Sequence, residues 1–538
     1  MAEPQTYAYA AVEVGGIQNY IFATGKLKEV IGASQIIELV TAEETWAPLL
    51  KNLGLELLEA VPPSGGDRWA FKLQAQAGSL ALLLPGADWG RRFLKDYARL
   101  ILGRWPGLPV DGALVEHVAL SEVINRQADS QIACQRAQRP PDGLPLNPFV
   151  EMAPLDGRAA VKRDRSKKDG KKTGPWLSRP SLVRRDDCWL KKAKERLTAE
   201  FEDELKKVLD GRQVEWSDDL EELLAGREKR RVALIHIDGN DLGHFFSREI
   251  NKGPAAGENF EGLVRSTRTI NELSGLITEA NRAAFQRALA AAAQADQAGR
   301  RKAEKTSLYR APFRPLVMGG DDLTALVRAD LAFDFLAAFV SEYEKRTQAH
   351  ELSLGVGMVI MPASYPFLKA YHLAESLCSN AKKTTVGDNP RPSSLDYVII
   401  SGEVDNDLDA LRRRAVADDG SRLTGKPFKL TSGFLEDFLK KADEVLNCLP
   451  RAHTRGALEI CRRGRAAAQP AYAKLRDNIR RELGGRHEAA LMNVKRFDEI
   501  FHDGFFEKPG HDYYQTALAD YLELRDYRPG ADSEPGED

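Results

Sequence analysis

The stretch 315–327, PLVMGGDDLTALV, decides the fold because it reads as two apolar strands joined by a turn. The turn is Gly319-Gly320-Asp321-Asp322, and a glycine-rich turn between short apolar runs is typical of a β-hairpin. Glycines there permit positive φ angles and leave room for a phosphate or a base near the backbone. The pattern therefore predicts a hairpin whose tip carries two aspartates.

An upstream strand supplies a third carboxylate. Residues 232–238, VALIHID, form an apolar run fit for a buried strand, and the run ends at Asp238. The other expected elements are a helix over 263–304 before the hairpin, and a helix over 331–346 and a strand over 352–361 after it. This β-α-β-β-α-β order is ferredoxin-like. Its first strand lies beside the hairpin, so we expect Asp238 and Asp321 to meet at one edge of the sheet.

The first 130 or so residues repeat the same order. The expected elements are a strand over 7–14, a helix over 17–40, a hairpin of 69–76 and 79–84, a helix over 91–102 and a strand over 110–120. Two similar units indicate an internal duplication, in which only the second unit carries the acidic turn. The predicted fold class is α+β, with two ferredoxin-like palm domains, a helical linker and a C-terminal helical domain.

The expected domain boundaries follow composition. They are a degenerate first palm at 1–135, a linker with a basic disordered loop and helices at 136–228, the catalytic second palm at 229–403, a helical domain at 404–528 and a disordered acidic tail at 529–538. Residues 139–180 are rich in proline, glycine and charge, which predicts an exposed, mobile segment. Its basic centre, 162–172, has two open interpretations, an RNA contact or a solubilising loop.

Composition limits the classes of function. The chain has 538 residues and a formal net charge of -2, so any attraction to nucleic acid must come from local patches. The sequence shows no signal segment and no apolar run long enough to cross a membrane, which predicts a cytoplasmic protein. The five cysteines are scattered and form no C-x₂-C pair, so neither a disulfide framework nor a zinc site is expected.

The clustered carboxylates predict metal chemistry. Asp238, Asp321 and Asp322 would repel one another unless a cation lies between them, and Mg²⁺ (or Mn²⁺) accepts such hard oxygen ligands. Metal ions of this kind can activate a ribose hydroxyl and stabilise a leaving pyrophosphate. We therefore expect nucleotidyl transfer on ATP or another NTP, with these three aspartates as metal ligands and catalytic residues. The expected nucleotide-binding residues are Gly239, Gly319, Gly320, Lys382 and Lys383.

Each feature alone also has an ordinary structural interpretation. The acidic turn can be a plain hairpin, Asp238 can cap a helix, and the two lysines can end a solvated helix. Their occurrence together and in this order favours the catalytic interpretation.

These residues resemble the palm domain shared by GGDEF diguanylate cyclases and the large subunit of type III CRISPR effectors, the Cas10 family. The turn ends in Asp-Asp, as in the CRISPR family. The stretch 238–243, DGNDLG, is similar to that family's Asp-Gly-Asp-Asn-Met-Gly motif, with Asn240 and Asp241 in swapped order. The stretch 12–22, VEVGGIQNYIF, is similar to the Gly-Ile-Gln signature of the family's first palm.

The resemblance implies a cyclase that joins ATP into cyclic oligoadenylate signals for antiviral defence, with RNA and CRISPR effector subunits as partners. Longer members of the family carry an HD nuclease domain and often a zinc-binding insertion. We expect neither here.

Two alternatives stay open. The chain can be an RNA-binding scaffold subunit without turnover, or a diguanylate-cyclase-like enzyme that uses GTP.

Overall fold

The computed structural model describes most of the chain. The described residues are 7–60, 67–76, 78–124, 130, 133–134, 151–164, 174–224, 231–252, 259–299, 308–400, 408–431, 433–448, 451–483, 488–500, 506–508 and 514–527. Most of the predicted basic loop and the whole predicted acidic tail lie outside these residues.

The first sheet has the strand order of a ferredoxin-like fold. In sheet order its strands are β2 (Glu56–Leu58), β3 (Trp69–Gln76), β4 (Ser79–Leu84), β1 (Tyr7–Val14) and β5 (Val110–Val118). The central strand β1 pairs antiparallel with both β4 and β5. The predicted hairpin of the first palm is therefore confirmed, and the short β2 extends the sheet at its edge.

The helices of this unit are α1 (Ile17–Phe22), α2 (Leu27–Thr41), α3 (Glu43–Asn52), α4 (Ala87–Arg104) and α5 (Leu120–Ile124). The single helix predicted over 17–40 is thus wrong, because the chain leaves the helical path at Lys26, whose φ and ψ of -106° and 116° are extended. The break separates the short α1 from α2, so that α1 can take its own direction.

The region between the two sheets is more ordered than composition predicts. The described edges of the segment 139–180 form an antiparallel hairpin of β6 (Ala160–Arg163) and β7 (Trp176–Ser178), in which Leu177 and Ser178 are buried. The helices α7 (Arg179–Arg184), α8 (Asp187–Leu197), α9 (Asp203–Val208) and α10 (Leu220–Leu223) follow, with a π-helical turn (Thr198–Glu202) before α9. Buried Glu29 of α2 accepts hydrogen bonds from Ser181 and Arg185 at 2.7 and 2.6 Å, which fastens this region to the first palm.

The second sheet contains the predicted acidic hairpin. In sheet order its strands are β11 (Phe313–Gly319), β12 (Asp322–Arg328), β9 (Arg231–Gly239), β13 (Leu354–Pro362), β14 (Ser393–Ile399) and β15 (Phe428–Leu430). The first four strands have the ferredoxin-like order, and the predicted α+β class with two such palms is confirmed. The strand β15 lies in a region expected to be wholly helical. A separate pair of short parallel strands joins β8 (Gln213–Glu215) to β10 (Leu308–Arg310).

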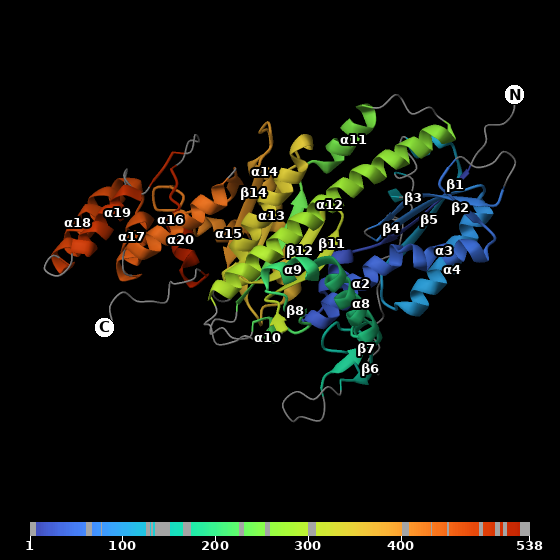
Figure 1. The fold of residues 1–538 in the computed structure, drawn as a ribbon, viewed down its shortest axis with the longest axis horizontal. Helices are drawn as coiled ribbons and strands as arrows, with labels where there is room; N and C mark the ends of the chain where they lie inside the picture. The colour runs from blue at the N-terminus through green and yellow to red at the C-terminus, as the bar shows by residue number, and fades with distance from the viewer. Residues whose placement is uncertain are drawn as a thin grey trace.

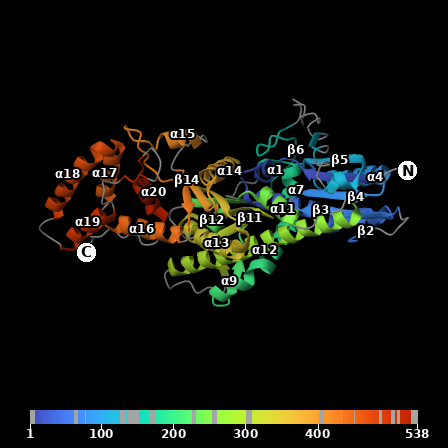
Figure 2. The ribbon, with the colours of Figure 1, turned by 90° about the horizontal axis from the view of Figure 1, so that it is seen from above.

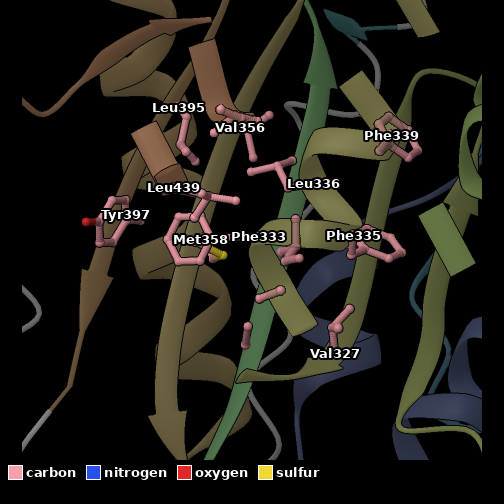
Figure 3. Packing of buried hydrophobic residues seen from close by; sticks show 14 of the residues in the cluster. Val327, Phe333, Phe335, Leu336, Phe339, Val356, Met358, Leu395, Tyr397 and Leu439 are labelled. Carbon is pink, nitrogen blue, oxygen red and sulfur yellow. The ribbon is translucent and has the colours of Figure 1, made fainter. Parts of the chain in front are cut away.

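Helices cover both faces of the second sheet. The helices α12 (Phe260–Gly299) and α13 (Ala332–Thr347) pack on one face, α14 (Phe367–Thr384) packs on the other, and α11 (Leu242–Lys252) follows β9. In Figure 3, Phe333 and Leu336 of α13 lie beside Met358 and Val356 of β13. Burial of such apolar side chains contributes roughly 1.5–3 kcal/mol each.

The two palms share one hydrophobic core. Val232 and Leu234 of β9 belong to the same buried cluster as Ala10 and Val12 of β1, and α14 contributes Tyr371 to it. On the other face of the first sheet, Phe260 at the start of α12 packs against Tyr7 and Trp69. The 40-residue α12 therefore runs alongside both palms, as Figures 1 and 2 show.

The C-terminal helices lie at the opposite end of the molecule from the first palm (Figure 1). They are α15 (Leu408–Arg413), α16 (Phe434–Cys448), α17 (Arg451–Arg462), α18 (Arg465–Leu483), α19 (Glu488–Ile500) and α20 (Leu518–Glu523). Buried Lys426 joins them to the second palm through ion pairs with Asp520 and Glu523. Across the ranges that the structure describes, no helix is long and apolar enough to cross a membrane.

Candidate active site

The register of the second sheet brings two carboxylates together. Asp322, the first residue of β12, pairs directly with Asp238 of β9, and Gly319 pairs with Asp322 across the hairpin. Directly opposed residues point to the same face, with Cβ atoms about 4.5–5.5 Å apart. We predicted that Asp238 would meet Asp321. The strand neighbour is instead Asp322, because Gly320 and Asp321 form the two-residue turn.

The turn is held by a hydrogen bond to the long helix. Asn281 of α12 donates its side-chain N–H to the carbonyl oxygen of Gly320 at 2.7 Å. Neither Gly319 nor Gly320 has a positive φ angle, so this turn does not use the conformational freedom that glycines permit. A Cβ added at Gly320 would have no neighbour within 4 Å. The glycines therefore leave open space beside Asp321, which agrees with the second reason given for them.

Lys382 of α14 lies directly on the acidic pair. Its ammonium donates to Asp238 Oδ2 at 2.6 Å and to the carbonyl oxygen of Gly239 at 2.7 Å. Its path crosses Gly355 of β13, where an added Cβ would come within 2.8 Å of Lys382 Cε and closer still to Cγ. The neighbouring Lys383 is exposed. Of the two lysines predicted to bind phosphate, Lys382 thus contacts the carboxylate of Asp238, and Lys383 is open to solvent.

Asp322 is contacted from two sides. Gln18, from α1 of the first palm, donates its side-chain N–H to Asp322 Oδ2 at 3.2 Å. Asp322 Oδ1 lies 3.3 Å from His236 Nδ1 and accepts no hydrogen bond from the described residues. His236 is buried and also lies 3.2 Å from Thr324 Oγ1. The site therefore combines residues of both palms.

Burial and like charge change the protonation of these groups. Desolvation and the charges of Asp238 and Asp321 raise the pKa of Asp322 to about 7. Desolvation, followed by the charge of Asp238, also raises the pKa of Asp321. Desolvation lowers the pKa of His236 to about 4, so its imidazole is neutral at neutral pH. The acidic group as a whole therefore favours a bound cation over three free negative charges.

The helix α14 packs very closely on the site. A Cβ at Gly357 of β13 would come within 2.6 Å of the backbone nitrogen of Cys378 and closer still to the carbonyl oxygen of Ala374. Desolvation raises the pKa of the buried Cys378 thiol to about 12, so this cysteine is no nucleophile at neutral pH. The small residues of β13 thus serve to place α14, and with it Lys382, against β9.

The loop after β9 has a structural role. Asn240 is buried and donates its side-chain N–H to Ser353 Oγ at 2.9 Å, whereas Asp241 has a φ of 51° and forms an ion pair with Arg391. A Cβ at Gly239 would come within 2.9 Å of Leu242 Cγ. Asp241 therefore faces Arg391, and Gly239 leaves room for the side chain of Leu242 while its backbone carbonyl accepts from Lys382.

A metal ion would be held by Asp238 and Asp322, with Asp321 in the adjacent turn. The buried, unpartnered Oδ1 of Asp322 and the mutual repulsion of the carboxylates fit such an ion. As the side chains stand, however, no cluster of three or more metal-binding residues is assembled within the described ranges. A site with three carboxylates would therefore require Asp321 to turn toward the pair of Asp238 and Asp322, and Lys382 would have to share Asp238 with the ion.

A cavity lies beside the turn, between the palms. It has a volume of about 670 Å³ and is lined by Gly320 and Asp321, by β3 and by the helices α11 and α12. Its polar lining includes Lys72, Gln74, Gln76, Ser266, Asn271 and Ser274. Pockets of 300–1,000 Å³ are typical of small-ligand sites. The cavity could not be seen in the sequence, because its walls come from segments about 200 residues apart.

The ferredoxin-like second sheet and its acidic hairpin are together typical of a palm domain. Residues 231–389 match the family model described as Cas10/Cmr2, second palm domain. This part of the chain is therefore similar to the second palm domain of that family, and the resemblance predicted from the acidic turn is confirmed over these residues.

Solved structures of Csm1 are similar to the chain. A Csm1–Csm4 cassette in complex with AMPPNP has 13% identity and a TM-score of 0.44, over 97% of this chain and 70% of that chain. The cassette in complex with cA4 has 13% identity and a TM-score of 0.44, over 93% and 69%. Csm1 of T. onnurineus has 15% identity and a TM-score of 0.44, over 90% and 65%. No match was found among curated proteins.

Three residues of the site were not predicted: Gln18, Asn281 and Gly355. Gln18 lies in the quoted Gly-Ile-Gln signature, but nothing in the sequence indicated that it reaches the other palm. Asn281 is one polar residue in a long helix, and Gly355 is one of several small residues in its strand. Only the three-dimensional structure shows their contacts.

Proposed function

We propose that this chain is a metal-dependent nucleotidyltransferase that joins nucleoside triphosphates, ATP in particular, into cyclic oligonucleotide messengers of antiviral defence. The observation that carries the proposal is the direct pairing of Asp238 with Asp322 at the end of a palm strand, next to the Gly320-Asp321 turn. The family match of residues 231–389 supports it.

In the proposed reaction, the 3′ hydroxyl of one nucleotide attacks the α-phosphorus of another. A new P–O bond forms, the bond from the α-phosphorus to the oxygen that bridges to the β-phosphate breaks, and pyrophosphate leaves. The hydroxyl proton passes to solvent. Repeated steps of this kind lengthen a linear oligonucleotide. The 3′ hydroxyl of its last nucleotide then attacks the α-phosphorus of the triphosphate on its first nucleotide, which closes the ring and releases pyrophosphate.

The residues have separate roles in this proposal. Asp238, Asp321 and Asp322 hold Mg²⁺ or Mn²⁺, which would lower the pKa of the attacking hydroxyl and neutralise the phosphates. Lys382 compensates the charge of Asp238, and Lys383 offers a cation to the triphosphate. Gly319 and Gly320 leave room for the nucleotide beside the turn.

The setting we propose is a type III CRISPR effector complex, with RNA and neighbouring effector subunits as partners. The exposed arginines Arg462, Arg463 and Arg465, at the junction of α17 and α18, offer a basic surface for such partners. In the scaffold alternative this surface would act without turnover at the acidic pair.

A nucleotide screen tests the proposal. The purified protein is incubated with each of the four NTPs and Mg²⁺ or Mn²⁺, with and without RNA, and the products are identified by mass spectrometry. We expect cyclic adenylates and pyrophosphate, and the Asp321→Ala, Asp322→Ala double variant should make neither. The control removes two exposed carboxylates of α16, Glu436→Ala with Asp437→Ala, and should keep full activity. Products from GTP alone would favour the diguanylate-cyclase alternative, and copurified RNA with no turnover under any condition would favour the scaffold.

A further inference from the structure

The short helix α1 belongs to the first palm but lies on the second. Its N-cap is Gly16, whose φ of 56° is left-handed, and the amide of Tyr20 donates to the carbonyl oxygen of Gly16 at 3.0 Å. At its other end, the ring of Phe22 stacks on Tyr371 of α14, with centroids 4.5 Å apart and an angle of 16° between the rings. Both rings are fully buried, so α1 is fixed against the helix that also carries Lys382.

From this position Gln18 reaches the acidic pair. Its N–H contacts Asp322 Oδ2, on a carboxylate that is 30% exposed, whereas the other oxygen of Asp322 lies near His236 within the sheet. Asp238, the other member of the pair, is contacted by Lys382 from its own palm. Within the described ranges, Asp322 is therefore the member of the acidic pair that accepts a hydrogen bond from the first palm.

The chemistry of Gln18 indicates more than packing. Its Oε1 atom is buried and has no hydrogen-bond partner within the described residues. A buried amide oxygen without a partner is unfavourable, and an apolar side chain of similar size would fill the same space without that penalty. Gln18 nevertheless carries an amide, and the hydrogen bond that this amide makes is the one its N–H donates to Asp322.

We propose that Gln18 is a positioning residue for Asp322, so that the first palm holds the second palm's carboxylate in its metal-binding orientation. The proposal rests on the proposed function of Asp322 as a metal ligand. The first palm has no acidic pair of its own, because Glu13 faces Ser79 at the position where Asp238 faces Asp322 in the second sheet. The proposed role of Gln18 explains how this palm still contributes to the site.

The test compares Gln18→Met, which keeps the bulk and removes the donor, with Asn19→Ala, which removes an exposed amide from the same helix. Loss of a hydrogen bond that orients a metal ligand typically lowers metal affinity or activity about 10- to 100-fold. We expect Gln18→Met to weaken Mn²⁺ binding, measured directly by calorimetry without nucleotide, by that factor. We expect kcat to fall similarly, KM for ATP to stay within about twofold, and the melting temperature to stay unchanged.

Other outcomes would overturn the proposal. Wild-type Mn²⁺ affinity in Gln18→Met would show that Asp322 needs no help from the first palm. A lower melting temperature in Gln18→Met and in the smaller Gln18→Ala, with metal affinity restored on cooling, would show a purely structural contact. If the wild-type protein binds Mn²⁺ but turns over no nucleotide, the proposed function fails, and the Mn²⁺ comparison still decides the role of Gln18.

Discussion

Replacing Gly355 by alanine should displace Lys382 from Asp238. The added methyl group would come within 2.8 Å of Lys382 Cε and 3.1 Å of its Cδ, distances that require the lysine to move. Moving it breaks the contacts of the ammonium to Asp238 and to the Gly239 carbonyl, at 2.6 and 2.7 Å. Hydrogen bonds to charged groups contribute about 1.5–3 kcal/mol when buried. The partners here are 23% and 39% exposed, so we expect a net loss of about 1 kcal/mol.

Backbone conformation does not oppose the substitution, because Gly355 has no positive φ angle. At such a position Gly→Ala by itself stabilises by about 0.4–1 kcal/mol. In a Lys382→Ala background, where the clash is absent, Gly355→Ala should therefore be neutral or slightly stabilising. The two substitutions should be strongly non-additive, since both act through the same side chain.

The assay is a double-mutant cycle, with denaturant unfolding and the rate of pyrophosphate release measured for all four proteins. We expect both single variants to lose activity to a similar degree and the double variant to lose no more. Gly357→Ala is the contrasting case. There the added Cβ meets the backbone of α14, so it should destabilise the fold itself. Full activity in Gly355→Ala, or additive losses in the double variant, would refute the role given to Lys382.

Two further predictions concern charge. Asp322→Asn should stabilise the metal-free protein at pH 8. The pKa of Asp322 is about 7 in the folded protein and 3.8 ordinarily, so ionisation of this carboxyl destabilises the folded state. The loss of stability develops as pH rises from about 4 to 7 and stays constant at higher pH. The pKa shift limits this change in unfolding free energy to roughly 4 kcal/mol, and the partial exposure of Asp322 reduces it to about 1–2 kcal/mol. Urea unfolding from pH 4 to 8 measures the change, and a variant less stable than wild type at pH 8 would contradict the prediction. In the proposed function Lys383 acts only on the triphosphate, so Lys383→Ala should raise KM for ATP severalfold, and because the lysine is exposed the melting temperature should not change. Steady-state kinetics measures this, with Lys369→Ala on the same helix as the control, and an unchanged KM would contradict it.

The sequence predicted the order of elements well where hydrophobic runs are bounded by glycines. The stretch 232–238 and the Gly319-Gly320-Asp321-Asp322 turn lie on β9 and between β11 and β12, as expected. The order of the elements does not fix the pairing register of β9 with β12 to the residue. A shift of one residue decides whether Asp321 or Asp322 faces Asp238. Alternation of apolar and polar residues fixes the register of a strand with one buried face, but β9 and β12 are buried on both faces and show no alternation.

Contacts between distant segments account for most of what was missed. The hydrogen bond from Gln18 joins residues 304 positions apart, and the walls of the cavity beside Asp321 come from both palms. The hairpin of β6 and β7 was missed because a charged composition suggested disorder, whereas Leu177 and Ser178 of β7 are buried in the folded chain. The strand β15 has only three residues and is recognisable mainly through its pairing with β14.

We propose above that Asp238 and Asp322 form the metal site of a nucleotidyltransferase. The most direct measurement is the rate at which ATP and Mg²⁺ give oligonucleotide and pyrophosphate, compared between wild type, Asp238→Asn and the exposed control Asp437→Asn. We expect product from wild type and from the control, and a loss of at least about 100-fold in Asp238→Asn with the fold intact. Equal rates in wild type and Asp238→Asn would contradict it.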